Sequence, residues 1–177
     1  MRRFLDRLYA ASGALAAVCL AGIAVVMLAQ AAMREFGMLL RGADDIVSWL
    51  CAATAFLALG HTFRRGELVR VGLLIDLLPP RARRAFALGA LGITVLFGGY
   101  MVYAVLNFVY ESWKFNEVAQ GLIQIPIWIP QMSFAAGALI LFVALVDEFV
   151  VLSRGGTPAY QAAEDERRVS KDFGETL

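Results

Sequence analysis

The chain contains few charged residues, one histidine and two cysteines. Of its 177 residues, 18% are charged and 60% are hydrophobic, whereas about a quarter of the residues in a soluble domain are charged. The single histidine, His61, cannot supply both axial ligands of a b-type haem. Cys19 and Cys51 form no C-x-x-C pair. We therefore expect packing roles for the cysteines, a packing or hydrogen-bonding role for His61, and no cofactor or metal in this chain.

Charge is missing altogether from four long stretches. They are 18 to 29 residues long, contain no Asp, Glu, Lys or Arg, and cover 8–33, 46–63, 85–110 and 118–146. A helix crosses the hydrocarbon core of a bilayer in about 20 residues, so each stretch is long enough. We predict an all-α integral membrane protein with four transmembrane helices at about 9–33, 46–64, 85–110 and 127–152.

Little polar sequence remains outside these spans, which excludes several classes of protein. A separate soluble domain needs about 50 residues at least, and no such stretch is present. Basic clusters threaded with aromatics, the mark of a nucleic-acid surface, are absent. The sequence also lacks G-x-S-x-G, H-E-x-x-H and P-loop motifs. Enzymatic activity is not expected.

The basic residues are strongly asymmetric about the predicted spans. Thirteen of the sixteen Lys and Arg residues lie before the first span, between the second and third, or after the fourth. The positive-inside rule therefore places both termini and the middle loop in the cytoplasm. Trp49, Trp113 and Trp128 then fall near the outer surface, as an aromatic interface belt requires.

Two segments outside the spans have distinct compositions. The apolar stretch 68–78 carries Arg70 and Asp76 and is followed by Pro79-Pro80, so it is too short and too charged to span. It fits a short helix at the cytoplasmic interface. The segment 154–177 is polar and of mixed charge, and we expect a disordered cytoplasmic tail after a single membrane domain over 1–153.

Acidic residues flank two of the spans. Asp44-Asp45 precede the second span, where their carboxylates could cap free backbone N–H groups and favour the positive end of the helix dipole. Asp147-Glu148 stand near the C-terminal end of the fourth, where the dipole disfavours negative charge. Solvation at the interface or a loop arginine such as Arg64 or Arg70 would compensate them.

The middle of every span lacks ionisable side chains. Carriers of ions or protons usually keep such groups, or broken helices, near the bilayer midplane. Polar residues in the spans include Gln30, Asn107 and Gln131, and the first two, near the outer span ends, suit hydrogen bonds between helices. The alternative is a stand-alone, homo-oligomeric transporter or channel that uses these three as pathway residues.

Three motifs occur in a recognisable order. Arg34-Glu35-Phe36 ends the first span and the acidic pair follows. The middle loop reads Arg64-Arg65-Gly66-Glu67-Leu68-Val69-Arg70-Val71-Gly72-Leu73-Leu74, then Leu78-Pro79 and a basic cluster, and Ile125-Pro126-Ile127-Trp128 begins the last span. The chain thereby resembles the small membrane subunit of TRAP transporters, the DctQ-type small permease of tripartite ATP-independent periplasmic uptake systems. The middle loop is similar to the family pattern R-x-G-x-H-V-R-V-D-L-L, with Leu68 and Gly72 in place of its His and Asp.

The resemblance implies a subunit without a substrate path of its own. A large membrane subunit would hold the transport and sodium sites, and a periplasmic binding protein would deliver an organic acid. The chain would scaffold the large subunit in the bacterial inner membrane. Family-motif residues implied here are Gly66, Glu67, Val69, Arg70, Val71, Leu74, Leu78 and Pro79 in the inner loop, and Pro126 and Trp128 at the fourth helix. From topology and charge, the candidate docking rim for the binding protein is Arg34, Glu35, Arg41, Asp44, Asp45, Lys114 and Glu117.

Overall fold

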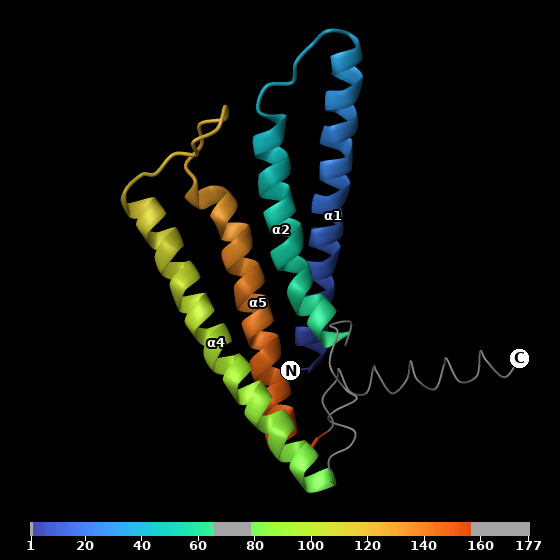
Figure 1. Cartoon of the computed structure of the whole chain (residues 1–177), viewed down its shortest axis with the longest axis vertical. Coiled ribbons are helices and arrows are strands. Elements are labelled where there is room, and N and C mark those ends of the chain that lie inside the picture. The colour runs from blue at the N-terminus through green and yellow to red at the C-terminus, as the bar shows by residue number, and fades with distance from the viewer. Residues whose placement is uncertain (1, 66–78, 157–177) are drawn as a thin grey trace, which may run out of the picture.

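The computed structural model describes residues 2–65 and 79–156 and consists of four long helices (Figure 1). They are α1 (Arg2–Glu35), α2 (Ala43–Arg64), α4 (Pro80–Lys114) and α5 (Trp128–Ser153). All four are long and apolar enough to cross a membrane, and the described residues contain no strand. The predicted all-α, four-helix class is confirmed to this extent. The interfacial helix expected at 68–78 and the tail beyond 156 lie outside the described residues, and the sidedness of the termini stays a prediction.

The four helices form a row in the order α1, α2, α5, α4. The main packing pairs are α1 with α2, α2 with α5, and α5 with α4. The row has two sides along the helix axes. We call the side at which α1 and α4 begin the terminal side. The opposite side, which carries the connections 36–42 and 115–127, is the loop side. The α1–α2 and α4–α5 hairpins come together at the terminal side and diverge toward the loop side (Figure 1). The edge helices α1 and α4 therefore each have a neighbour along one flank.

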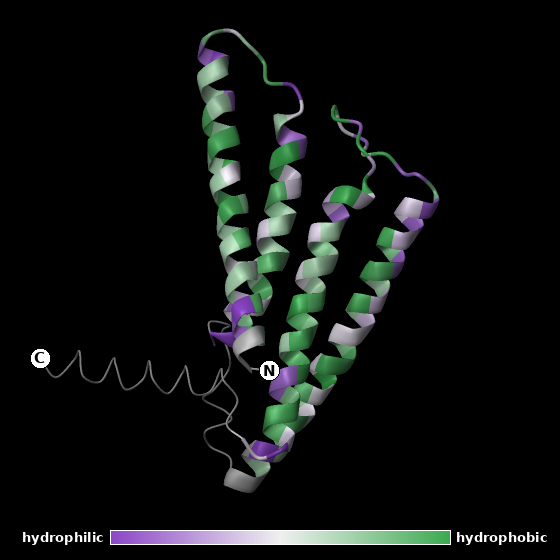
Figure 2. Ribbon diagram, turned by 180° about the vertical axis from the view of Figure 1, so that it is seen from behind, coloured by the Kyte–Doolittle hydropathy of each residue, from purple (hydrophilic) through white to green (hydrophobic). Residues whose placement is uncertain are grey.

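Strongly hydrophilic residues gather at the helix ends, and the long middles are mostly apolar (Figure 2). In the most apolar 18-residue segment of α1, only 11% of the residues are buried. In the corresponding segment of the inner helix α5, 39% are buried. Such an exposed apolar surface would be unfavourable in water, whereas lipid tails are as apolar as leucine and solvate it. The burial pattern thus fits a bilayer environment.

Small residues allow the closest helix approaches. A Cβ added at Gly13 of α1 would lie 2.9 Å from the Cγ of His61, and one at Gly60 of α2 would lie 2.8 Å from the Cγ2 of Ile140 on α5. At Gly137 of α5 an added Cβ would collide with the backbone of Phe56. These glycines set the spacing of the row, in the manner of small-residue contacts between membrane helices.

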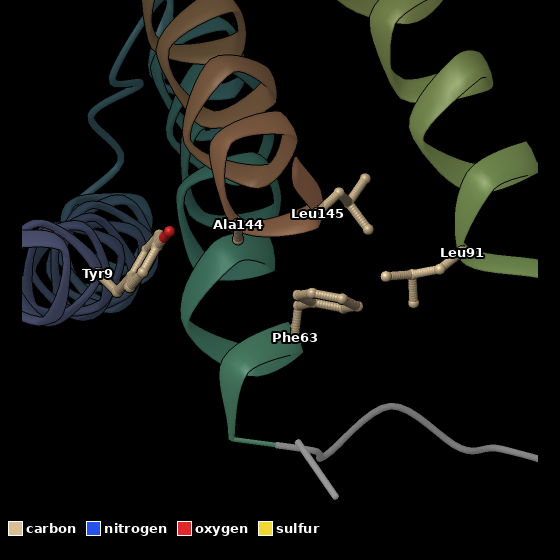
Figure 3. Packing of buried hydrophobic residues seen from close by; sticks show 5 residues of the cluster. All are labelled: Tyr9, Phe63, Leu91, Ala144 and Leu145. Carbon is tan, nitrogen blue, oxygen red and sulfur yellow. The ribbon is translucent and has the colours of Figure 1, made fainter. Parts of the chain in front are cut away.

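The apolar core is shared by all four helices only at the terminal side. Tyr9 of α1, Phe63 of α2, Leu91 of α4 and Ala144 with Leu145 of α5 form one buried cluster (Figure 3). A second cluster, built on Ala16, Ala53 and Leu57, joins α1 to α2 and is also contacted by Ala136 and Ile140 of α5. A third, built on Val105, Val109 and Ala135, joins α4 to α5. Away from the terminal side no cluster includes all four helices, and the hairpins stay in contact through α2 and α5.

Candidate partner-binding surfaces

An arginine at the terminal side connects three helices. Arg64 of α2 pairs with Asp6 of α1, with 2.6 Å between Nη2 and Oδ1, and with Asp147 of α5, with 3.6 Å between Nη1 and Oδ2. Its guanidinium carbon lies 5.0 Å from the ring centre of Tyr9. Of the two arginines named as partners for the acidic end of α5, Arg64 fills that place, and it offsets negative charge where the helix dipole disfavours it. This group is occupied within the chain.

The polar contacts between α1 and α2 explain His61. Its Nδ1 lies 3.2 Å from the carbonyl oxygen of Tyr9, and its ring packs on Gly13. Nearby, the Ser12 hydroxyl donates to the carbonyl of Leu57 at 2.5 Å. The histidine therefore has the packing and hydrogen-bonding surroundings that the sequence suggested. Both cysteines are free thiols: Cys19 packs beside the Ala16 cluster and Cys51 is exposed.

At the loop side, the segment 115–127 folds over the start of α2. The segment is closed by backbone hydrogen bonds from Ala119 N–H to the carbonyl of Ile125 at 2.9 Å and from Ile127 N–H to that of Glu117 at 3.0 Å. The carboxylate of Asp45 accepts the N–H of Ile123 at 3.1 Å. Since the N-cap of α2 is Gly42, without a side-chain cap bond, the capping role predicted for Asp44-Asp45 was wrong. Asp45 instead joins the two hairpins, while both carboxylates remain at the positive end of the dipole.

The predicted docking rim divides into side chains that form hydrogen bonds and side chains that form no ion pair, among which Lys114 has its Nζ 5.8 Å from the ring centre of Phe115. Three acidic members are engaged: Asp45 as above, Asp44 with the Gln30 amide at 3.4 Å, and Glu117 with the Ser112 hydroxyl at 2.9 Å. The remaining members are exposed and form no ion pair with a described residue; they are Arg34, Glu35, Arg41 and Lys114. Their role in docking stays a prediction.

Apolar tips at the loop side were not predicted as exposed from the sequence, although Phe36 belongs to the motif that ends the first span. Phe36 and Leu39 after α1 are 79% and 84% exposed, and Leu122 in the second connection is 74% exposed. An open pocket of about 570 Å³ lies between the end of α1 and the 37–40 turn, with Gln30 and Arg34 on its wall. The signal was present, because large apolar residues in a short connection have no helix face to bury them.

A polar face on α4 was also missed. Tyr100 and Tyr103 are 71% and 69% exposed, although both lie within the charge-free part of the helix. Asn107, noted earlier as a polar residue, follows on the same face and donates to Glu111 Oε1 at 3.2 Å. The 3-then-4 spacing of these residues was the available signal, since it places all three on one side of a helix.

The family-motif residues are only partly described. Trp128 is the first residue of α5 and packs against the Val105 cluster, while the backbone of Pro126 bridges to Val118. Pro79 is the N-cap of α4. The other inner-loop residues lie outside the described residues; they are Gly66, Glu67, Val69, Arg70, Val71, Leu74 and Leu78.

No group of three or more His, Cys, Asp or Glu side chains that could hold a metal ion occurs in 2–65 or 79–156. That this chain carries no cofactor stays a prediction.

In comparisons with known proteins, residues 23–155 match the sequence model of a family described as "Tripartite ATP-independent periplasmic transporters, DctQ component". No curated protein matches the chain.

Proposed function

Since this chain belongs to the DctQ family, one component of the tripartite ATP-independent periplasmic transporters, we propose that it is the small membrane subunit of a sodium-coupled importer of organic acids. The large membrane subunit carries the substrate and the sodium ions, and a periplasmic binding protein delivers the substrate. This chain scaffolds the large subunit in the inner membrane, with both termini in the cytoplasm.

One observation carries the accessory role. In the four candidate spans the charged side chains lie at the helix ends, and the middles contain none. The best-paired charge, Arg64, is engaged by Asp6 and Asp147 at the terminal side. Because ion-coupled carriers usually keep ionisable groups or broken helices near the midplane, four continuous helices without them support a subunit that assists transport by another chain.

Reconstitution tests this proposal. Uptake of labelled dicarboxylates, sugar acids and keto acids is measured in proteoliposomes that contain this chain alone, the large subunit alone, or both, with binding protein and an inward sodium gradient. Uptake is expected only for the complete set, and dissipation of the gradient should abolish it. Uptake by this chain alone would refute the accessory role and favour a stand-alone transporter using Gln30, Asn107 and Gln131.

The second part of the proposal is that the loop side docks the binding protein through Arg34, Glu35, Arg41 and Lys114. The exposure of these four side chains and the absence of ion pairs to described residues support it. Charge reversal at Arg41 and Lys114 should lower uptake several-fold at limiting binding protein. Arg7→Glu is the matched control, because it reverses an exposed charge at the terminal side. Unchanged uptake in the Arg41 and Lys114 variants would disprove docking at these residues.

A further inference from the structure

The polar face of α4 opposite α5 is out of place for a helix surrounded by lipid. Tyr100, Tyr103 and Asn107 follow one another by three and four residues, so their side chains leave the helix on one side. The opposite side of α4 carries Val102 and Val105, which are 8% and 6% exposed. The tyrosines therefore point away from the rest of the chain.

The depth of these tyrosines in the membrane distinguishes them from an interface belt. Arg84 and Lys114 bound a candidate span of 31 residues, and Tyr100 lies next to its middle residue. At 1.5 Å per residue, Tyr100 is about 21 Å from Lys114 along the helix. The hydrocarbon core extends about 15 Å from its centre to each surface. With Lys114 near the surface of this core, Tyr100 therefore lies near the middle of the membrane. Tyr110, by contrast, lies about 15 Å further toward the loop side, at the depth where aromatic belts occur.

The two hydroxyls have no hydrogen-bond partner among the described residues. Threonines in the helices satisfy their own hydroxyls locally: Thr94 donates to the carbonyl of Ala90 at 2.8 Å. A tyrosine hydroxyl stands at the far end of a rigid ring and cannot reach back to its own helix backbone. A hydroxyl transferred into hydrocarbon without a partner is unfavourable, so a tyrosine at this depth calls for an acceptor from another molecule.

The other exposed surfaces lack this feature. The outward face of α1 carries Leu15, Val18 and Leu28, which lipid tails solvate fully. The apolar tips at the loop side lie beyond the spans, where water and lipid head groups are available. Only the α4 face combines midplane depth with unpartnered donors, within the part of the chain that the structure describes.

We propose that the α4 face formed by Tyr100, Tyr103 and Asn107 is the surface on which a membrane helix of the large subunit packs. That helix supplies backbone or side-chain acceptors for the two tyrosine hydroxyls. The proposal rests on the proposed function, which provides the large subunit as the membrane-embedded partner. Hydrogen-bond complementarity at midplane depth favours a protein helix over a lipid tail, which has no acceptor.

Photocrosslinking tests which face meets the partner. A benzophenone amino acid is placed at position 100 or 103 of the full chain, and at position 18 on α1 as the matched control, with a tagged large subunit co-expressed. Irradiated membranes should give an adduct of summed mass from positions 100 and 103 and none from position 18. An adduct from position 18 alone, an adduct of twice this chain's mass, or no adduct from position 100 or 103 would overturn the assignment.

Co-purification of the unsubstituted chain with the tagged large subunit separates the two levels of the proposal. If the subunits do not co-purify, the proposed function fails and this inference fails with it. If they co-purify and position 100 or 103 gives no adduct, only the assignment of α4 fails.

A second variant set tests the hydroxyls themselves. Tyr100→Phe with Tyr103→Phe keeps both rings and removes both donors. Each interhelical hydrogen bond in a membrane strengthens the association constant about threefold. The double variant removes two such bonds and should therefore bind the large subunit roughly tenfold more weakly. Tyr110→Phe is the control, since water satisfies that hydroxyl at the interface, and it should stay within about twofold. Equal affinity of the double variant and the unsubstituted chain would refute a role for the hydroxyls.

Discussion

The two ends of this helix row are held together by different means. At the terminal side all four helices contribute to one apolar cluster, and Arg64 adds ion pairs to α1 and α5. At the loop side the hairpins diverge and are linked through the segment 115–127, whose Ile123 N–H reaches Asp45 (Figure 1). The difference shows that the chain stabilises itself at one end and leaves the other with little internal support.

This asymmetry has a packing origin. The inner helices α2 and α5 approach closely at Gly60 and Gly137 and stay in contact at Phe56 and Phe134, whereas no apolar cluster beyond this crossing includes all four helices. Buried contacts resist opening, whereas a few hydrogen bonds to an exposed segment open at low free energy. Substitutions should therefore act globally near the crossing and the terminal side, and locally at the loop side.

The largest effect is expected at the crossing itself. Gly137→Leu places a side chain against the Phe56 backbone, which cannot move aside as a flexible side chain would. The two hairpins are forced apart, at a cost of about 3 kcal/mol in the free energy of unfolding. Thermal unfolding in detergent measures it. Gly89→Leu on α4 is the control, since an added Cβ there meets nothing within 4 Å. Equal loss in both variants would contradict the role of the crossing.

The ion-pair group at the terminal side comes next. Arg64→Met keeps an unbranched apolar stem and leaves Asp6 and Asp147 without their cation, so we expect about 2 kcal/mol of destabilisation, less than for a fully buried pair because Asp6 is half exposed. Detergent unfolding curves check this value. Arg41→Met removes an exposed loop-side arginine and should change stability by less than about 0.5 kcal/mol. If both variants unfold alike, the two ends do not differ as described.

A smaller and local effect is expected at the loop side. Asp45→Ala removes the acceptor of the Ile123 N–H, worth about 1 kcal/mol, and frees the segment 115–127 from α2. Amide hydrogen exchange should accelerate over that segment, while the midpoint of thermal unfolding stays nearly unchanged. Asp44→Ala removes the neighbouring carboxylate, which accepts a hydrogen bond from the Gln30 amide. If exchange over the segment 115–127 became faster in both variants, the cause would be the loss of a negative charge at the start of α2. The hydrogen bond from Ile123 to Asp45 would then not be responsible.

The smallest effect has the opposite sign. The hydroxyl of Tyr9 is buried and has no hydrogen-bond partner among the described residues, although the ring packs under Arg64. Tyr9→Phe keeps the ring and removes the unsatisfied group, so stability should stay equal or rise by up to about 1 kcal/mol. Chemical unfolding in detergent is the measurement. A clear loss of stability would mean that the hydroxyl is paired in the membrane.

The helices were predictable because their signal is local. Charge-free stretches of sufficient length follow from composition. Three of the four became helices that extend past both ends of the stretch into its charged flanks, as α4 does at Pro80 and Lys114, whereas α5 begins at Trp128, inside the fourth stretch. The order of the row was not predictable, because apolar residues surround each helix and no stripe marks the packed side. Gly13 and Gly137 lie at helix contacts, whereas the small residues Ala17 and Ala21 of α1 are exposed.

The candidate sites were predictable in part, for a related reason. Charge identified the rim residues, but only the fold shows that Asp45 is engaged by a backbone group 78 residues away. Arg64 was one of two named partners for the acidic end of α5, and the fold places it beside Asp147, while Arg70 lies outside the described residues. Tyr100 and Tyr103 were not considered, because their depth becomes informative only once the limits of α4 are known.

The helix lengths make the row sensitive to bilayer thickness. The edge helices α1 and α4 have 34 and 35 residues, while α2 and α5 have 22 and 26. At 1.5 Å per residue the edge helices are about 50 Å long, longer than the roughly 40–45 Å of a whole bilayer, whereas α2 is about 33 Å long. Upright helices of such unequal length produce hydrophobic mismatch, which tilt relieves. A thinner membrane therefore favours a greater tilt of the edge helices, within the limits that their packing on α2 and α5 allows.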